Sequence, residues 1–325
     1  MQLKLAKTLW GVPEADDKSQ WDELFRRIKE EGFSAIEVVA PFWRTDPPLL
    51  RELLDKHGLE LICQLHTTGS YIDSSGNYVY STSSKLEDHV ASFAALAKEA
   101  AALGPVIINS HSGHDSWGSD DRAVEYFVKA LEVEQSICGG GDGEGGKKPP
   151  PIIVHETHRQ RLLFSPYSTA QLLAKPELRA LKINADLSHW CCVCEKVFDA
   201  NDPRDDWWPA TLEAVARHCA FIHCRVGHAE GPQVNDPSAP EHAMEVAAHF
   251  EWWRQIWTAK IAASEASSTE ATACCWAEPE FGPSPYLQTL PHTNMPVADL
   301  WDVNSRVAGM IRVEFAKVPG SSSSL

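Results

Sequence analysis

The sequence predicts a single-domain α/β protein folded as a TIM-type (β/α)8 barrel, and three observations support this fold class. Short apolar runs rich in β-branched residues alternate with amphipathic stretches along the 325 residues, which predicts parallel strands joined by helices. The alternation comprises eight units, the number that closes such a barrel. The turn after the first run, Gly11-Val12-Pro13-Glu14, lacks the glycine-rich phosphate turn that is typical of an open, doubly wound sheet.

The apolar runs are the predicted strands. They cover residues 3–12, 35–40, 59–66, 106–111, 152–158, 181–187, 220–226 and 272–281. Each run is short, as strands are, and a stretch with helical spacing follows it.

The predicted helices have recognisable ends. The first covers residues 19–31, with Ser19 as the expected N-cap and Gly32 behind its last turn. The second ends before Gly58, and the third has an apolar face that includes Phe93 and Ala97. The helices after the first are expected at residues 47–57, 84–103, 120–137, 168–179, 209–218, 241–264 and 297–315.

One domain is expected over residues 1–318, because strand–helix units continue on both sides of every interruption. The low-complexity stretch GGGDGEGGKKPPP, at about residues 139–151, is expected to be a flexible insertion. The serine-rich residues 319–325 are expected to form a disordered tail.

Composition excludes several classes of partner. The net charge of −16 opposes binding to a phosphate backbone, so no nucleic-acid partner is expected. No apolar stretch has the length of a membrane span or of a signal sequence, so no membrane partner is expected. The nine cysteines, an odd number, favour reduced thiols and a cytoplasmic location. Homo-oligomer formation is left open.

Polar residues gather where the predicted strands end, which is where barrels of this kind carry their chemistry. These residues are His66, Asn109, His111, Glu156, His158, Asp186, His189, His223, Arg225, Glu278 and Glu280. Alternate residues of a strand face the barrel interior, and the layer under the helices should be apolar. We therefore expect the residues of the charged parity to face the barrel mouth, and His155 to face the helices or a neighbouring loop. Glu37 and Trp10 are further candidates for lining the mouth.

Acidic and histidine side chains from four consecutive strands predict a divalent metal site. The donors are Glu156, Asp186, His223 and one of Glu278 and Glu280. This mixture of oxygen and nitrogen suits Mn²⁺, Mg²⁺ or Co²⁺ better than a structural Zn²⁺. The alternative for each residue taken singly is an ordinary hydrogen-bonded or solvated side chain.

Three basic residues after the fifth run, His158, Arg159 and Arg161, are expected in a solvated loop. His66 and His111 are expected either to contact substrate or to be satisfied structural histidines.

The chain resembles the xylose-isomerase-like TIM barrels, a family that includes sugar isomerases, sugar epimerases and endonuclease IV. The resemblance spans essentially the whole chain. It is carried by four motifs in order: HETH at 155–158, ADLSHW at 185–190, FIHCR at 221–225 and EPEFGP at 278–283.

The resemblance implies one divalent ion, with zinc as a further option, bound by Glu156, Asp186, His223 and Glu280. Glu280 is preferred to Glu278 because EFGP is similar to the end of the family's eighth strand. His189, Arg225, His66 and His111 would bind substrate, although Arg225 follows the metal histidine more closely than in the epimerases.

The implied activity is isomerisation or epimerisation of a small carbohydrate. Glu156 and Glu280 would be the catalytic bases that move a proton through a cis-enediolate. Two alternatives remain at this stage. One is a multi-zinc phosphodiesterase like endonuclease IV, although the stretch Asn235-Asp236-Pro237-Ser238 lacks that subfamily's D-x-H pair. The other is a barrel protein without catalytic activity.

Overall fold

The computed structural model describes residues 1–72, 78–139, 149–266 and 274–322. The predicted flexible insertion lies mostly outside these residues, and so does the end of the predicted tail.

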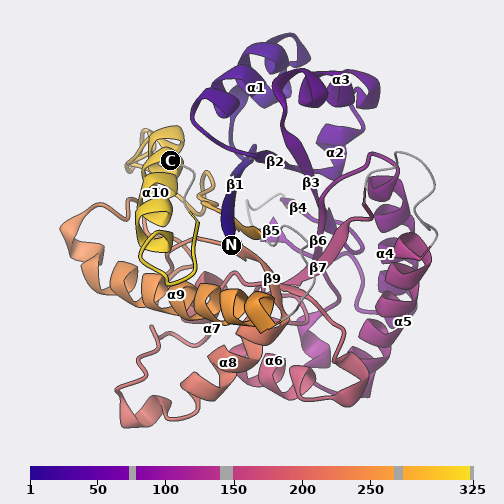
Figure 1. The fold of residues 1–325 in the computed structure, drawn as a ribbon, viewed down its shortest axis with the longest axis vertical. Coiled ribbons are helices and arrows are strands. Elements are labelled where there is room, and N and C mark those ends of the chain that lie inside the picture. Colours follow the sequence, from indigo (N-terminus) through magenta and orange to yellow (C-terminus); the bar gives the residue numbers. More distant parts are fainter. Residues whose placement is uncertain (73–77, 140–148, 267–273, 323–325) are drawn as a thin grey trace.

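The strands form one closed parallel barrel, which confirms the predicted fold class (Figure 1). Their order around the barrel is β1-β10-β9-β8-β7-β6-β3-β2. The barrel strands are β1 (Gln2–Thr8), β2 (Ala35–Val39), β3 (Glu60–His66), β6 (Ile107–His111), β7 (Ile152–Glu156), β8 (Ile183–Asn184), β9 (Cys219–His223) and β10 (Cys274–Glu278). Two further short strands, β4 (Tyr71–Ile72) and β5 (Tyr78–Val79), pair with each other outside the barrel.

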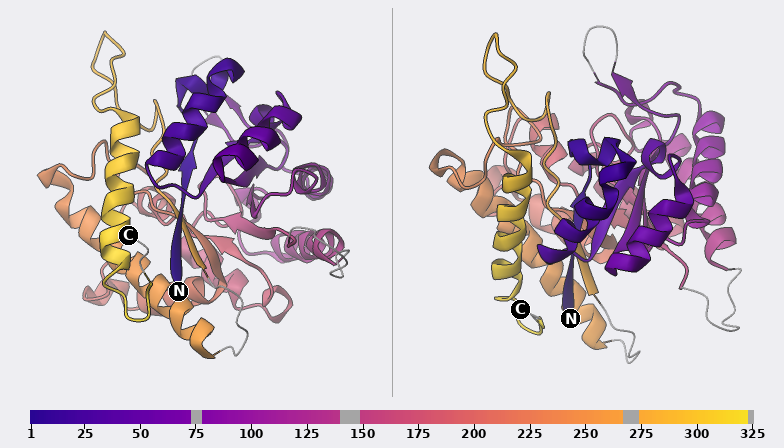
Figure 2. Two further views of the ribbon diagram at one scale, coloured as in Figure 1. Left: turned by 45° about the horizontal axis from the view of Figure 1, so that its top comes forward. Right: turned by 90° about the horizontal axis from the view of Figure 1, so that it is seen from above.

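The helices surround the strands as an outer ring (Figure 2). They are α1 (Trp21–Glu30), α2 (Ala40–Trp43), α3 (Pro47–His57), α4 (Leu86–Ala101), α5 (Asp121–Cys138), α6 (Pro166–Leu173), α7 (Ser188–Val193), α8 (Trp208–His218), α9 (Ala243–Ala266) and α10 (Leu300–Phe315). Within the described ranges, none of these helices is long and apolar enough to cross a membrane. The N-terminal amine of Met1 donates to the Gly320 carbonyl at 2.9 Å, so β1 begins beside the segment that follows α10.

Two of the predicted helix ends are confirmed and one N-cap is wrong. Gly32 and Gly58 both have positive φ and stand behind α1 and α3, where a left-handed residue ends a helix without strain. Ser19 caps nothing. It lies in a preceding 3-10 turn, where the Asp17 carboxylate accepts its backbone N–H at 3.0 Å. An aspartate two residues upstream satisfied the free donor instead.

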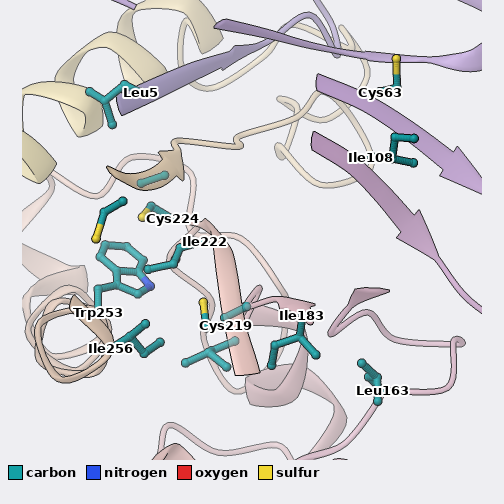
Figure 3. Packing of buried hydrophobic residues seen from close by; sticks show 14 of the residues in the cluster. Leu5, Cys63, Ile108, Leu163, Ile183, Cys219, Ile222, Cys224, Trp253 and Ile256 are labelled. Carbon is teal, nitrogen blue, oxygen red and sulfur yellow. The ribbon is translucent and has the colours of Figure 1, made fainter. Parts of the chain in front are cut away.

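Apolar residues fill the barrel floor and the layer between strands and helices. The floor consists of Ala6, Ala35, Ile62, Ile107, Val154, Phe221 and Trp276. The next residue of each strand faces outward: Figure 3 shows Ile222 of β9 beside Trp253 of α9. This alternation means that every second residue of a strand returns to the barrel interior.

A polar tier lies directly above the apolar floor. The tier has eight members. Seven of them lie two positions beyond a floor residue on the same strand, and the eighth is Asn184 of β8. The seven are Thr8, Glu37, Gln64, Asn109, Glu156, His223 and Glu278. All eight side chains are buried. Buried polar groups are costly unless they are paired with one another or with a ligand. The polar tier is therefore the part of the barrel in which we expect a ligand-binding site.

Helix α9 holds the loop that follows β9. A Cβ at Gly227 would lie 2.6 Å from the Ser188 carbonyl oxygen, so only glycine allows this close approach. The Gly227 N–H donates to His249 Nε2 at 3.1 Å, and His249 Nδ1 donates to the Glu245 carbonyl at 2.8 Å. The bond to Nε2 needs the neutral imidazole, because a protonated Nε2 cannot accept. Burial lowers the pKa of His249 to about 4.

This histidine should make the protein sensitive to acid. The folded-state pKa lies below the ordinary value of 6.5, so its contribution to stability is complete above pH 6.5 and is lost as the pH falls toward 4. At about 1.4 kcal/mol per pH unit, the loss amounts to roughly 3 kcal/mol. The His249→Gln variant should be less stable than the wild type at pH 8, and the difference should shrink by about this amount at pH 4. Urea unfolding at both pH values measures it. A difference that stays constant with pH would contradict the assignment.

Candidate metal centre and active site

Four side chains from consecutive strands converge at the carboxyl ends of the barrel strands. Glu156 ends β7, Asp186 follows β8, His223 ends β9 and Glu280 follows β10. One ligand atom from each lies within 4.8 Å of the others, and all four residues are buried. We call this set the acid quartet. The structure thus brings together the four residues that the sequence analysis singled out as metal ligands.

Neutral donors hold one oxygen of Glu156 and leave the other without a partner. Oε2 accepts from Asn109 Nδ2 at 2.7 Å and from Asn184 Nδ2 at 3.2 Å, and His111 Nε2 lies 3.0 Å away. Oε1 is buried and makes no hydrogen bond to the described residues. The amides fix the carboxylate group while one lone-pair face stays open.

A cation holds the opposite side of the quartet. The Arg225 guanidinium donates to Asp186 Oδ2, and its Nη1 lies 3.0 Å from Glu280 Oε2. Ser188 donates its backbone N–H to Asp186 Oδ1 at 3.1 Å. Arg225 was expected to bind substrate. In the structure it pairs with two of the four candidate ligands, because only Cys224 separates it from His223 and the loop returns over Ser188.

Glu278, which ends β10, and Glu280, two residues later, belong to different groups. Glu280 joins the acid quartet, whereas Glu278 groups with Glu37 and His223 deeper in the barrel; we call this second set the inner triad. His223 belongs to both. Its Nδ1 lies 3.1 Å from Glu280 Oε2, and its Nε2 lies 3.2 Å from Glu37 Oε2. Both oxygens of Glu278 are buried without a hydrogen-bond partner among the described residues.

The site carries an excess of negative charge. Burial raises the pKa of Glu37, Glu156 and Glu278, and it raises the pKa of Asp186 to about 7. Burial also disfavours the Glu280 anion, but the charges of His223 and Arg225 outweigh it and lower the pKa of Glu280 to about 2.

His223 responds to the same charges. Burial disfavours its cation, yet the neighbouring carboxylates raise its pKa well above the ordinary value. Among the described residues, the positive groups that pair with the five carboxylates of the quartet and triad are the Arg225 guanidinium and the protonated His223 imidazole, because His111 and His189 are neutral. A bound divalent cation would balance this excess.

The donors fit a divalent ion. Glu156 Oε1, Glu280 Oε2 and His223 Nδ1 are buried atoms without a hydrogen bond to the described residues, and they belong to one quartet. Three carboxylates and one imidazole form a mixed oxygen–nitrogen set of the kind that Mn²⁺, Mg²⁺ or Co²⁺ takes.

A row of four histidine rings borders the quartet. His66 lies 4.2 Å from His111, His111 lies 4.3 Å from His158, and His158 lies 3.9 Å from His189, all between ring centroids. Burial lowers the pKa of all four well below 6.5, so they are neutral at pH 7. Neutral imidazoles can each donate and accept a hydrogen bond, which suits hydroxyl and carbonyl groups.

The expectation of a solvated loop after the fifth strand is wrong. His158 is buried in the histidine row, and Arg161 is fully buried. The Arg161 guanidinium donates to the Thr67 carbonyl at 2.9 Å and to the Gly69 carbonyl at 3.3 Å. Its charge is thus taken up by loop carbonyls, a tertiary contact that no local pattern reveals. Only Arg159 of the three is partly exposed.

The parity assigned to His155 is confirmed. Its Nε2 lies 2.9 Å from Glu134 of α5, and its ring packs against Phe93 and Phe127. The supporting amides Asn109 and Asn184 were given no role from sequence. Their signal is a polar residue at an inward position of an apolar strand.

Comparisons with known proteins agree with the fold. No protein-family model matches the chain. A Xenopus laevis protein named "Putative hydroxypyruvate isomerase" is 24% identical over 190 residues, which are 57% of this chain and 66% of that protein. The match therefore spans just under two thirds of the relative's length.

Among solved structures, D-allulose 3-epimerase from Methylomonas sp. superposes with a TM-score of 0.54 at 13% identity, covering 96% of this chain and 98% of that chain. The 3-keto-D-glucoside 4-epimerase from E. coli superposes with a TM-score of 0.53 at 13% identity, covering 96% and 99%. These solved structures are sugar epimerases, and the chain shares their fold.

The two glutamates at the end of β10, Glu278 and Glu280, provide a test of the metal site. We expect Glu280→Gln to weaken Mn²⁺ binding by more than about 100-fold, because the change removes a charged member of the quartet. Glu278→Gln, two residues earlier on the same segment, should weaken it less than about tenfold. Isothermal titration of chelator-treated protein measures both. Equal losses, or a larger loss for Glu278→Gln, would show that the quartet is not the metal site.

Glu37 should act on the metal through His223. A carboxylate next to Nε2 keeps that nitrogen protonated and leaves Nδ1 free to bind an ion. Glu37→Leu should therefore weaken Mn²⁺ binding by about 10- to 100-fold, and Glu37→Gln by less because its amide oxygen can still accept. Wild-type affinity in the leucine variant, measured by the same titration, would refute this role.

Proposed function

We propose that the protein is a metal-dependent isomerase or epimerase of a small sugar or a sugar-like hydroxy-ketone. The observation that carries the proposal is the pair Glu156 and Glu280. Each is buried in the acid quartet, and each has a carboxylate oxygen without a hydrogen bond to the described residues. Two carboxylates in one ion-binding set can exchange a proton with a bound substrate.

The candidate ligands Glu156, Asp186, His223 and Glu280 would hold one divalent ion, of Mn, Mg, Co or Zn. Such an ion supplies a Lewis acid that polarises a carbonyl group and stabilises the oxyanion that develops next to it. The histidine row would bind the hydroxyl groups of the substrate.

The proton would move between the two glutamates. One carboxylate removes the proton from the carbon beside the carbonyl, which gives a cis-enediolate. The other returns a proton, either to the opposite face of the same carbon or to the neighbouring carbon. The first outcome is epimerisation, and the second is aldose–ketose isomerisation. Asn109 and Asn184 keep Glu156 in place during the transfer.

The names of the similar proteins support this class. The curated relative is named as an isomerase of hydroxypyruvate, and D-allulose 3-epimerase has also been solved in complex with D-allulose. Both substrates have a carbonyl group next to a hydroxyl-bearing carbon.

A multi-zinc phosphodiesterase is the second candidate. The set His111, Glu156 and His158 could hold a further ion, because one ligand atom of each lies within 4.8 Å of the others. The net charge of −16 opposes a nucleic-acid substrate. Metal analysis separates the candidates: a single ion per chain favours the isomerase, and three zinc ions favour the phosphodiesterase.

Proton exchange tests the proposal directly. Protein loaded with Mn²⁺ is incubated in D₂O with a panel of ketoses and hydroxy-keto acids, and deuterium at carbon is followed by NMR. We expect exchange with at least one compound, and Glu156→Gln should slow it by roughly 10²- to 10⁴-fold because a general base is lost. Glu213→Gln, on the exposed face of α8, is the matched control and should exchange like the wild type. A Glu156→Ala variant with unchanged metal content and unchanged deuterium exchange would refute the proposal.

A further inference from the structure

We propose that Arg159 binds an anionic group of the substrate, a carboxylate or a phosphate, so that the preferred substrate is a small acid rather than a neutral sugar. This inference rests on the proposed function for its location, because it names the substrate class of the same site.

Arg159 has no anionic partner among the described residues. Its Nη2 donates to the Tyr80 hydroxyl at 3.3 Å, and its guanidinium carbon lies 4.9 Å from the centre of the Tyr286 ring. Its Nε is buried and makes no hydrogen bond to those residues. Arg159 forms no ion pair with any carboxylate of the described ranges, although the chain has 45 acidic residues against 29 lysines and arginines.

The other two arginines near the site have the hydrogen-bond acceptors that Arg159 lacks among the described residues. Arg225 pairs with the carboxylates of Asp186 and Glu280, and Arg161 donates to loop carbonyls. A partly buried guanidinium loses hydration, and that loss is normally offset by charge-assisted hydrogen bonds. Arg159 has aromatic faces, the Tyr80 phenol and the Cys192 thiol around it, so the described residues leave its bidentate edge without an acid.

Within the described ranges, no neighbouring side chain supplies a negative charge in its place. The titratable side chains around the guanidinium are Tyr80, Tyr286, Cys192 and the neutral His158. Burial raises the pKa of Tyr286 and of Cys192, so neither ionises at pH 7. Burial of Arg159 therefore points to a ligand that brings its own charge.

One aromatic ring separates Arg159 from the acid quartet. The guanidinium carbon of Arg225 lies 5.1 Å from the Tyr286 ring centre, compared with 4.9 Å for Arg159. His189, whose Nε2 lies 2.7 Å from Arg225 Nη2, also contacts the ring of His158, next to Arg159 in the chain. Arg159 is thus placed to meet the far end of a molecule of a few carbon atoms whose other end reaches the quartet.

The net charge of the protein also bears on how an anionic substrate could bind. At −16 the chain repels anions, so an anionic substrate needs a local cation to bind. A guanidinium offers two parallel N–H bonds, a geometry that fits carboxylate and phosphate oxygens and fits a sugar hydroxyl poorly.

Binding of three related probes to the Mn²⁺-loaded full chain tests the proposal. Hydroxypyruvate carries a carboxylate, dihydroxyacetone phosphate carries a phosphate, and dihydroxyacetone is neutral. We expect the wild type to bind at least one anionic probe roughly 10- to 100-fold more tightly than dihydroxyacetone. The anion that binds more tightly identifies the source of the charge. Titration calorimetry gives the dissociation constants without any need for turnover.

Substitution assigns the preference to Arg159. Arg159→Gln should reduce the affinity for the preferred anion to that for dihydroxyacetone, while its own affinity for dihydroxyacetone stays unchanged. Arg159→Lys should retain part of the preference, because it keeps the charge and loses the bidentate geometry. Arg217→Gln, on the exposed face of α8, is the matched control and should bind like the wild type.

Two results would overturn the inference. One is a wild-type protein that binds neither anion more tightly than dihydroxyacetone, a comparison that needs no variant to fold. The other is an unchanged preference in Arg159→Gln. Deuterium exchange in the same samples distinguishes the two proposals. A preference for an anionic probe without any exchange refutes the proposed isomerase activity. Exchange with every probe that does not depend on Arg159 refutes only the proposal of an anionic substrate.

Discussion

The burial of five carboxylates at one end of the barrel is the constraint on which the site depends. Glu37, Glu156, Asp186, Glu278 and Glu280 share a region in which Arg225 and His223 are the available positive groups. Charges in such surroundings are costly unless they are paired, so the excess calls for a cation. The apolar floor and the outer core supply the stability that allows the barrel to hold this arrangement.

The closed barrel explains how the carboxylates stay in position. Each lies on a strand or within two residues of its end, and the supporting amides Asn109 and Asn184 come from strands as well. Strand positions vary little, because each strand is hydrogen-bonded to two neighbours. The loop after β9 is the exception, and there Gly227 and His249 restrict it so that Arg225 meets Asp186. Groups fixed before a substrate arrives need no reorganisation during reaction.

The site is electrically asymmetric. The acid quartet lies at one side, and Arg159 and Arg161 follow Glu156 on the loop after β7, with neutral histidine rings between them and the quartet. Neutral donors recognise hydroxyl and carbonyl groups, whereas an unpaired guanidinium recognises an anion. The Tyr286 ring contacts both guanidinium groups, with the Arg159 carbon 4.9 Å and the Arg225 carbon 5.1 Å from its centre.

The sequence by itself determined the repeating units and the parity of each strand, because both follow from local periodicity. Eight alternations predict a barrel, and an acidic residue at an inward position near a strand end is a candidate ligand wherever the chain folds. Tertiary structure decided what depends on distant partners. It separated Glu278 from Glu280, which share a parity, because one lies a tier deeper beside Glu37. It buried His158 and Arg161, paired Arg225 with two carboxylates and, among the residues that the structure describes, gave Arg159 none. Such pairings join residues far apart in the chain, and local sequence carries no record of them.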